Sequence, residues 1–212
     1  MIDFATKYIE VKMKIKKVIA GELEANCYII YPENSNEAFM IDPGYDSDRY
    51  LSALKKENLK LKGIILTHYH SDHSGAVDGV LNEADAPVYI HCLDKDIEAC
   101  KAEPDVLLSD GDILELGNYH IKVMHTPGHS RGSVCYYVLE DDIVFTGDTI
   151  FNIDLGATIF NGGSHQDMKE SCKNTVDKWG DDVFIYPGHG DGCTMKWVRE
   201  NNREFMEIIN EV

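Results

Sequence analysis

The sequence has no long apolar run, no signal-like N-terminus and few basic residues. No stretch reaches the roughly 18 apolar residues that a membrane-spanning helix requires, so we expect no membrane partner. Residues 1–17 lack the apolar core of a secretory signal, which favours a cytoplasmic protein.

Cysteines are present, but their spacing is not that of a binding motif. None of them lies in a C-x-x-C pair. Because no secretory signal is evident, we expect reduced thiols scattered over core and surface, with disulfides as the open alternative. The six cysteines are Cys27, Cys92, Cys100, Cys135, Cys172 and Cys193.

Basic residues are outnumbered by acidic ones, 20 against 37, which gives a formal net charge of −17. A field of this sign repels phosphate backbones and anionic membrane surfaces. We therefore expect a small-molecule substrate and no nucleic-acid partner. Bound divalent cations would offset part of the acidic excess. Composition does not indicate the oligomeric state.

The chain of 212 residues contains no linker or low-complexity segment, so we expect one domain over residues 1–212, with residues 1–12 as a dispensable extension. Strands are predicted at 13–20, 26–31, 37–41, 63–66, 87–90, 112–116, 119–125, 133–139, 142–146 and 183–186. Helices are predicted at 48–58, around 77–81, and at 93–101, 164–179 and 194–209. Two groups of strands, each followed by helices, suit two stacked sheets with helices outside, among other α/β arrangements.

A dense group of metal-ligand types follows the apolar run GIIL. It contains His68, His70, Asp72 and His73. On an extended chain residues i and i+2 point to the same side, so the first two histidines can hold one ion. A turn into a helix would then direct the other two residues to a neighbouring point. This spacing predicts a pair of adjacent metal ions, about 3.5–4 Å apart.

Three later segments, TPGHS, FTGDT and YPGHG, follow apolar runs in the same way. Each displays one ligand-type residue next to a glycine: His129, Asp148 and His189. Singly, each could be an ordinary turn. Together with the first group they offer seven ligands from four loops, and glycine next to a ligand lets the backbone approach the ion.

In this order and spacing the four segments resemble the metallo-β-lactamase superfamily, and in particular its glyoxalase II (hydroxyacylglutathione hydrolase) branch. The resemblance runs from about Met13 to about Asn202, and THYHSDH is its most specific part. It implies an αββα four-layer sandwich and two divalent transition-metal ions, zinc before iron or manganese. It also implies ligands His68, His70 and His129 for one ion, ligands Asp72, His73 and His189 for the other, and Asp148 as the bridge.

The implied chemistry is hydrolysis of a thioester or related ester. Metal coordination lowers the pKa of water toward ~7, so a hydroxide bridging the ions can attack a carbonyl at neutral pH. Asp72 and Asp148 are the catalytic carboxylates of this scheme. A thioester suits it because a thiolate leaves without a strong general acid.

Two other readings share these motifs. A sulfur (persulfide) dioxygenase would use one iron, held by His68, His129 and Asp148. A non-enzymatic metal-binding module is the alternative from another class, and the complete ligand set weakens it. Outside the motifs, Arg131 and Tyr69 flank ligands and are candidates for substrate contact. The remaining candidates, read as structural, surface or supporting residues, are His91, His120, His125, His165 and Cys193.

The resemblance also predicts that glutathione is not recognised as in glyoxalase II. That branch has a helical C-terminal domain, whereas this sequence continues for about 23 residues after His189. It also places a lysine and two tyrosines where this chain has Ala157, Ile159 and Asp191. None of these three side chains can pair with a glutathione carboxylate.

Overall fold

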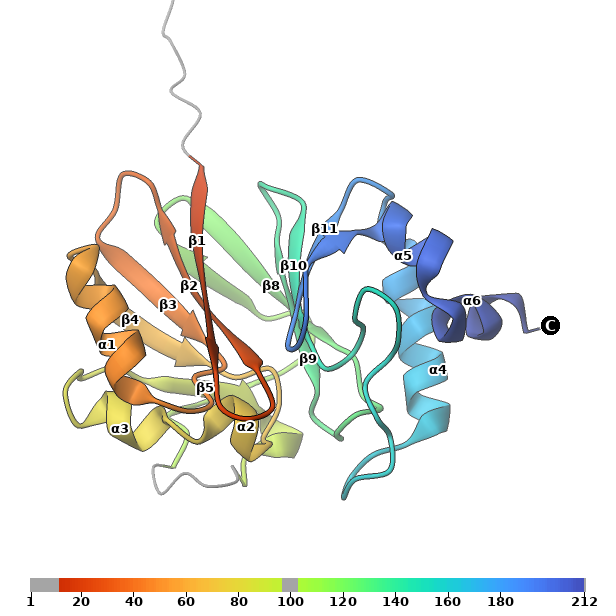
Figure 1. Ribbon diagram of the computed structural model, residues 1–212, viewed down its shortest axis with the longest axis horizontal. Helices are drawn as coiled ribbons and strands as arrows, with labels where there is room; N and C mark the ends of the chain where they lie inside the picture. Colours follow the sequence, from red (N-terminus) through yellow and green to blue (C-terminus); the bar gives the residue numbers. More distant parts are fainter. Residues whose placement is uncertain (1–11, 97–102, 212) are drawn as a thin grey trace, which may run out of the picture.

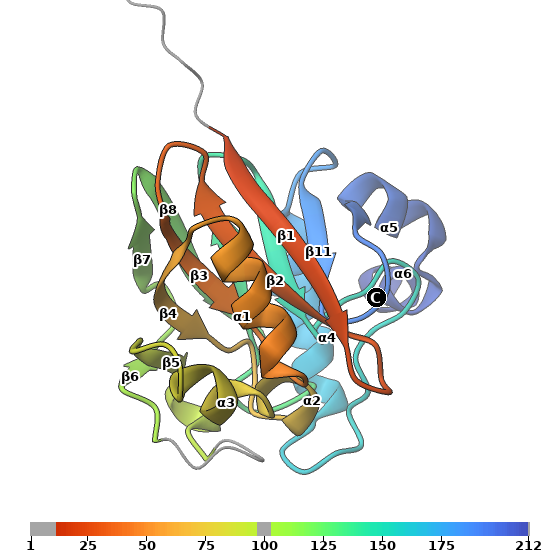
Figure 2. The same ribbon diagram turned by 60° about the vertical axis from the view of Figure 1, so that its left-hand side comes forward.

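The computed structural model describes residues 12–96 and 103–211, and the strands of this part of the chain form two six-stranded sheets. The strand order is β1-β2-β3-β4-β5-β6 in the N-terminal sheet and β12-β11-β10-β9-β8-β7 in the C-terminal sheet. The sheets stack face to face, and helices cover both outer faces (Figures 1 and 2). The predicted αββα sandwich is therefore confirmed.

The N-terminal half contains one sheet and the helices on its outer face. Its strands are β1 (Met13–Ala20), β2 (Ala25–Pro32), β3 (Glu37–Ile41), β4 (Lys60–Ile65), β5 (Val88–His91) and β6 (Val106–Leu108). Its helices are α1 (Ser47–Lys56), α2 (Ser71–Ser74), α3 (Val77–Leu81) and the 3-10 turn η1 (Cys92–Asp94).

The C-terminal half repeats this plan. Its strands are β7 (Ile113–Leu116), β8 (Tyr119–His125), β9 (Val134–Val138), β10 (Ile143–Gly147), β11 (Phe184–Pro187) and β12 (Cys193–Thr194). Its helices are α4 (His165–Asn174), α5 (Met195–Asn201), α6 (Arg203–Asn210) and the 3-10 turn η2 (Val176–Lys178).

The core has three layers, one between the sheets and one beneath each set of helices. Strand β4 shows how the sequence produces this arrangement. Its consecutive residues Ile64 and Ile65 are both fully buried, the first under the N-terminal helices and the second between the sheets. A continuous apolar run of this kind is typical of a strand covered on both faces.

Most predicted elements are present, but two helices are shorter than expected. The helix predicted around 77–81 is present as α3, with the short helix α2 before it, whereas the predicted helix at 164–179 ends as α4 before η2. The predicted C-terminal helix is broken at Asn202, whose side-chain oxygen accepts a hydrogen bond from the amide of Phe205 (3.0 Å) and so caps α6. Short strands β6 and β12 were not expected.

Some predictions fall partly outside the described residues. Of the helix expected at 93–101 the structure describes η1, and residues 97–102 lie outside it. Residues 1–11 of the expected extension also lie outside it. The five described cysteines are free thiols, and Cys100 belongs to the part that is not described. No helix among residues 12–96 and 103–211 is long and apolar enough to cross a membrane.

One edge of the sandwich brings several strand ends together. Strands β10 and β11 are parallel, so both end there, and β9, antiparallel to β10, begins there. The two sheets are joined at this edge by backbone hydrogen bonds: Val134 N donates to Thr67 O (2.9 Å), and Asn26 N donates to Gly188 O (2.7 Å). The loops that leave these strands are therefore held close together.

Candidate metal centre

Four loops at this edge carry the candidate ligands. The first follows β4, the second joins β8 to β9, and the third and fourth follow β10 and β11. The structure brings their side chains into two overlapping groups. The predicted ligands, all of which lie in this cluster, are His68, His70, Asp72, His73, His129, Asp148 and His189.

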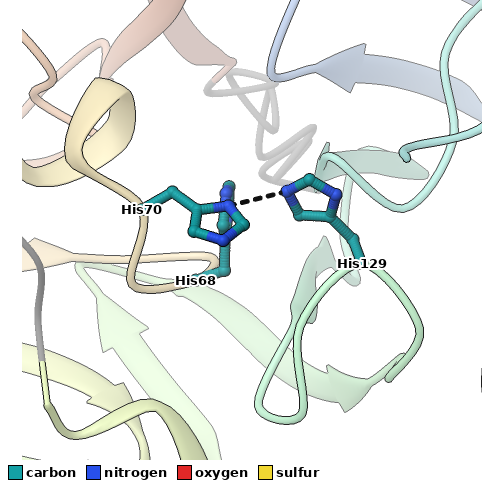
Figure 3. A group of neighbouring side chains, drawn as sticks. All are labelled: His68, His70 and His129. Carbon is teal, nitrogen blue, oxygen red and sulfur yellow. Dashed lines mark hydrogen bonds between the residues drawn. The ribbon is translucent and has the colours of Figure 1, made fainter. Parts of the chain in front are cut away.

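The first group consists of His68, His70 and His129, whose nitrogens lie within 4.8 Å of one another. Figure 3 shows the imidazole of His70 facing that of His129 across the gap between their loops. Nδ1 of His70 lies 2.9 Å from Nε2 of His129. Three imidazole nitrogens converging on one point form a ligand set that zinc, copper, iron and nickel accept.

The convergence of His68 and His70 has a different cause from the one predicted. Strand β4 ends at Ile65, and His68 lies in a bend rather than on an extended segment. The rings still approach, with centroids 4.8 Å apart. The loop is shaped by its contacts with the other sheet, so alternation along a strand does not place the two histidines.

The second group consists of Asp72, His73 and His189. Nε2 of His73 lies 3.2 Å from Nε2 of His189, and Nε2 of His189 lies 3.3 Å from Oδ2 of Asp72. His73 is fully buried, whereas about a quarter of the His189 side chain is exposed. This half of the centre therefore combines a carboxylate with two imidazoles and is more open to solvent.

Asp148 lies between the two groups. Its Oδ2 is 3.5 Å from Nε2 of His129 in the first group and 3.6 Å from Nε2 of His189 in the second. Its Oδ1 is 3.4 Å from Nε2 of His73. One carboxylate with an oxygen near each group is the geometry that a bridging ligand requires.

The outer nitrogens of the histidines are already committed to hydrogen bonds. Nδ1 of His129 donates to the carbonyl of Ala157 (2.7 Å), and Nδ1 of His189 donates to the carbonyl of Leu23 (2.9 Å). A carbonyl only accepts, so the proton of each neutral ring is on Nδ1 and the lone pair is on Nε2. Both lone pairs therefore face the centre, as metal-bound histidines require.

Two buried polar atoms in the centre have no hydrogen-bond partner: Nε2 of His68 and Oδ1 of Asp148. Burying an unsatisfied polar atom costs about 1–3 kcal/mol, so such atoms call for an explanation. Metal ions would satisfy both, and the donor set of imidazoles and carboxylates suits divalent transition metals. The residues present therefore fit a metal centre.

Comparison with known proteins agrees with this geometry. The family model described as "Metallo-beta-lactamase superfamily" matches residues 20–189. The chain belongs to this superfamily. The probable metallo-hydrolase YqgX of Bacillus subtilis is 31% identical over 205 residues, which cover 90% of this chain and 96% of that protein. Hydroxyacylglutathione hydrolase GloC of Haemophilus influenzae is 28% identical over 206 residues, covering 90% and 97%.

Solved structures show the same metallo-β-lactamase fold. The B3 metallo-β-lactamase BLEG-1 superposes with a TM-score of 0.85 at 30% identity, covering 93% of this chain and all of its own. ETHE1 from Myxococcus xanthus gives 0.80 at 25% identity, with coverages of 92% and 88%. TTHA1623 in a di-iron-bound form gives 0.78 at 29% identity, with coverages of 89% and 98%.

Asp42 is a residue of this metallo-β-lactamase site that sequence reasoning missed. Its Oδ1 accepts the amide of Thr67 (2.7 Å), and its Oδ2 accepts the Thr67 hydroxyl (2.6 Å) and Nδ1–H of His73 (3.1 Å). The Thr67 oxygen in turn lies 3.0 Å from Nδ1 of His68. Asp42 therefore orients one histidine of each group. In the sequence Asp42 precedes Pro43 and Gly44, a pattern typical of a turn.

Burial dominates the protonation of the first group. It lowers the pKa of His68 well below its ordinary value, with His73 and His129 adding to the effect. Burial also lowers the pKa of His129, although Asp148 opposes this. His68 and His129 therefore resist protonation and present free lone pairs.

Carboxylates dominate the second group. Burial opposes the charged form of His73, but Asp148, Asp42 and Asp72 outweigh it and raise the pKa of His73 to about 9. The pKa of His189 is raised because Asp72 and Asp148 outweigh its burial. Burial raises the pKa of Asp72, but His189 and His73 outweigh it and lower that pKa to about 2.

The glycines next to the ligands have different roles. A Cβ at Gly188 would collide with Oδ1 of Asp148 and with the His73 ring, so this backbone approaches the ligands as expected. At Gly128 (φ +145°) a Cβ would meet the backbone of Met168 in α4, and at Gly147 (φ +47°) it would meet the Thr67 side chain. These two glycines allow packing rather than approach to an ion.

The other residues singled out in the sequence lie in different places. Nε2 of His125 donates to the carbonyl of Arg131 (2.8 Å), and its ring stacks on His91 at 4.2 Å. His120 pairs with Glu140 on the surface, His165 begins α4, and Cys193 lies in β12 packed against the C-terminal core. Of these five, His125 and His91 therefore support a ligand loop.

Proposed function

We propose that this chain is a metal-dependent hydrolase with two divalent transition-metal ions, zinc before iron or manganese. The observation that carries the proposal is the pair of buried atoms without a hydrogen-bond partner, His68 Nε2 and Asp148 Oδ1, between two converging ligand groups. The first ion would be held by His68, His70 and His129, the second by Asp72, His73 and His189, with Asp148 shared by both.

When bound, the ions would supply a nucleophile from water at neutral pH and polarise the carbonyl under attack. The chain's own part is to hold the ligands rigidly. Ala157 O and Leu23 O fix the rings of His129 and His189. Asp72, whose lowered pKa keeps it ionised, presents an oxygen that can accept a hydrogen bond from water or substrate.

The surroundings favour a substrate with an apolar part. The ring of Phe160 lies 5.6 Å from His70 and 5.9 Å from His129, and 52% of this residue is exposed. An exposed aromatic ring beside the ligands offers a wall for an acyl or alkyl group. We propose a thioester as the substrate. This agrees with the similarity to GloC, whose name is that of a thioester hydrolase.

Three positions argue against efficient use of lactoylglutathione. The carbonyl of Ala157 is engaged by His129, Ile159 is 87% exposed and apolar, and Asp191 carries the same charge as a glutathione carboxylate. Each charged hydrogen bond that is not made forgoes roughly 1.5–3 kcal/mol of binding. We expect a high KM for lactoylglutathione and better activity on smaller or different thioesters.

The test is metal analysis of the purified protein together with a panel of thioester, lactone and persulfide substrates. The proposal predicts close to two ions per chain and turnover of at least one thioester with release of a free thiol. One iron per chain with oxygen consumed on addition of a persulfide would overturn it in favour of a dioxygenase. The similarity to ETHE1 makes this the outcome to check first.

A further inference from the structure

A cavity of about 200 Å³ lies beside the candidate metal centre. Its walls include Tyr69, Asn161 and Gly162. The Tyr69 ring lies 4.5 Å from the ring of His70, and its hydroxyl donates to the carbonyl of Asn161 (2.7 Å). A group bound in this cavity is therefore adjacent to the first ligand group.

Arg131 is the cationic residue among those that line the cavity. It is exposed, and its stem lies over Gly162, where an added Cβ would meet the Arg131 Cγ at 3.5 Å. No carboxylate in the described part of the chain lies within 4.0 Å of its guanidinium nitrogens. Within residues 12–96 and 103–211, its five donors are therefore not engaged by a carboxylate and are open to a ligand.

Neither of the two carboxylates that line the cavity forms an ion pair with Arg131. Oδ1 of Asp94 accepts the amide of Gly132 (2.7 Å), and Oδ2 accepts the hydroxyl of Ser130 (2.5 Å), so both oxygens are engaged. Burial raises the pKa of Asp94, although these hydrogen bonds oppose the shift. Asp96 is exposed and forms no ion pair with Arg131.

The backbone of Arg131 is fixed on both sides. Its carbonyl accepts a hydrogen bond from Nε2 of His125 (2.8 Å), and its neighbours Ser130 and Gly132 both bond to buried Asp94. The same loop carries His129, two residues earlier. A cation on a clamped loop next to a ligand is pre-organised to orient a substrate.

A second cation near the centre provides a contrast. Lys17 lies beside the loop that follows His189, with its ammonium 3.2 Å from the carbonyl of Gly190 and 3.4 Å from Oδ1 of Asp191. Its charge is already paired within the fold. Of these two cations flanking the ligand loops, Arg131 is the one that faces a cavity with its donors unengaged.

We propose that Arg131 binds an anionic group, a carboxylate in the simplest case, carried by the substrate away from the carbonyl that is cleaved. The inference rests on the proposed hydrolase function and adds a substrate class to it: anionic thioesters. The planar guanidinium forms paired hydrogen bonds with a carboxylate, which gives orientation as well as affinity.

The experiment compares matched thioesters that differ only in a carboxylate or a primary amide. One pair carries this group on the thiol half, as in the acetyl thioesters of 3-mercaptopropionate and 3-mercaptopropionamide, and another pair carries it on the acyl half. The readout is the ratio of kcat/KM for the charged and neutral members. It is measured in the metal-loaded parent protein, in Arg131→Met, in Arg131→Lys and in the control Lys17→Met.

For at least one pair we expect the parent ratio to exceed one and to fall about tenfold to a hundredfold in Arg131→Met, mainly through KM. Arg131→Lys should retain part of the preference because it keeps the charge but not the planar fork. Lys17→Met, which also removes one positive charge, should leave the ratio within about twofold. Equal ratios in Arg131→Met and Lys17→Met for both pairs would overturn the inference.

Calorimetric binding of the corresponding thioethers, which cannot be hydrolysed, separates this inference from the proposed function. Weaker binding of the charged thioether to Arg131→Met, with no thioester turned over by any variant, would support the anion site and overturn the hydrolase proposal. Turnover of thioesters with no charge preference, together with equal binding of the two thioethers, would support the hydrolase proposal and overturn the anion site.

Discussion

Three imidazoles make up one half of the candidate metal centre, whereas the other half combines a carboxylate with two imidazoles. In the first half burial keeps His68 and His129 neutral. In the second, carboxylates raise the pKa values of His73 and His189. The two halves share the same edge of the fold, so the difference comes from the residues that face each ring.

This difference separates two tasks of a ligand site. In the first half His68 and His129 are already deprotonated, so a metal ion has no proton to displace from these two rings. In the second half the carboxylates favour the protonated forms of His73 and His189 when no ion is bound. Metal binding must release these protons. Asp148 couples the halves because it contacts histidines of both.

The largest expected effect follows from removing this coupling. Asp148→Asn keeps the shape of the side chain but removes a ligand charge from both halves. We expect activity to fall by at least about a hundredfold, because even the loss of an outer partner costs 10–100-fold, and metal content to fall below two ions per chain. Turnover and elemental analysis measure this. Circular dichroism should show a retained fold, and unchanged turnover would contradict the bridging role.

The next effect tests whether one residue supports both halves. Asp42→Asn removes the carboxylate that orients Thr67 and His73. We expect metal affinity to fall about 10–100-fold, because these contacts fix ring orientation. Competition with a chelator measures the affinity. Glu140→Gln, which removes the surface partner of His120, is the control and should bind metal as the parent does.

Metal binding should depend on pH differently in the two halves. Below a pKa of about 9 the metal-free protein keeps His73 protonated, so an ion must displace that proton. Apparent affinity of the second half should therefore rise about tenfold per pH unit from neutral pH up to that pKa, whereas His68 and His129 of the first half contribute no such rise. His129→Ala isolates the second half and His189→Ala the first. Titration calorimetry in buffers of different ionisation enthalpy counts the protons, and equal release from both variants would remove the distinction.

The smallest expected effect concerns the acid stability of the protein and His91, which stacks on His125 outside the ligand set. Burial, followed by the charge of neighbouring His125, lowers the pKa of His91 to about 4, although Asp110 and Asp112 oppose this. The pKa of histidine in the unfolded chain is about 6.5. As the pH falls below this value, His91 is protonated in the unfolded chain but stays neutral in the folded protein, so the free energy of unfolding decreases until about pH 4. His91→Gln should reduce this acid loss by about 1 kcal/mol. Urea unfolding near pH 7 and pH 5 measures it, and parallel losses in parent and variant would exclude His91 as the source.

Much of the site was predictable because its residues are clustered in the sequence. His68, His70, Asp72 and His73 lie within six positions, and each of the later ligands follows an apolar run and adjoins a glycine. Asp42 gave no such signal, because an aspartate before Pro-Gly reads as a turn residue. Asp94 and the carbonyl of Ala157 were equally invisible, since their roles exist only through partners distant in the chain.

The helices illustrate the same limit. The periodicity of residues 194–209 predicts one helix, yet Asn202 turns inward, where its side-chain amide donates to the carbonyls of Phe151 and Asp154 (3.2 and 2.8 Å). Helix α2 does not continue into α3, because the amide of Ala76 donates to the carbonyl of Pro43 (3.0 Å) rather than to the preceding turn. Tertiary contacts override local propensity at both breaks.

The sequence by itself determined the alternation of buried strands and amphipathic helices, the kinds of ligand and the loops that carry them, because these depend on local pattern and side-chain chemistry. The tertiary structure decided which candidate ligands lie together, which nitrogen of the His129 and His189 rings faces the centre, and which cation beside it has no carboxylate partner among the described residues. Those properties depend on how two sheets are joined at one edge. There, hydrogen bonds such as Val134 N to Thr67 O connect residues far apart in the chain.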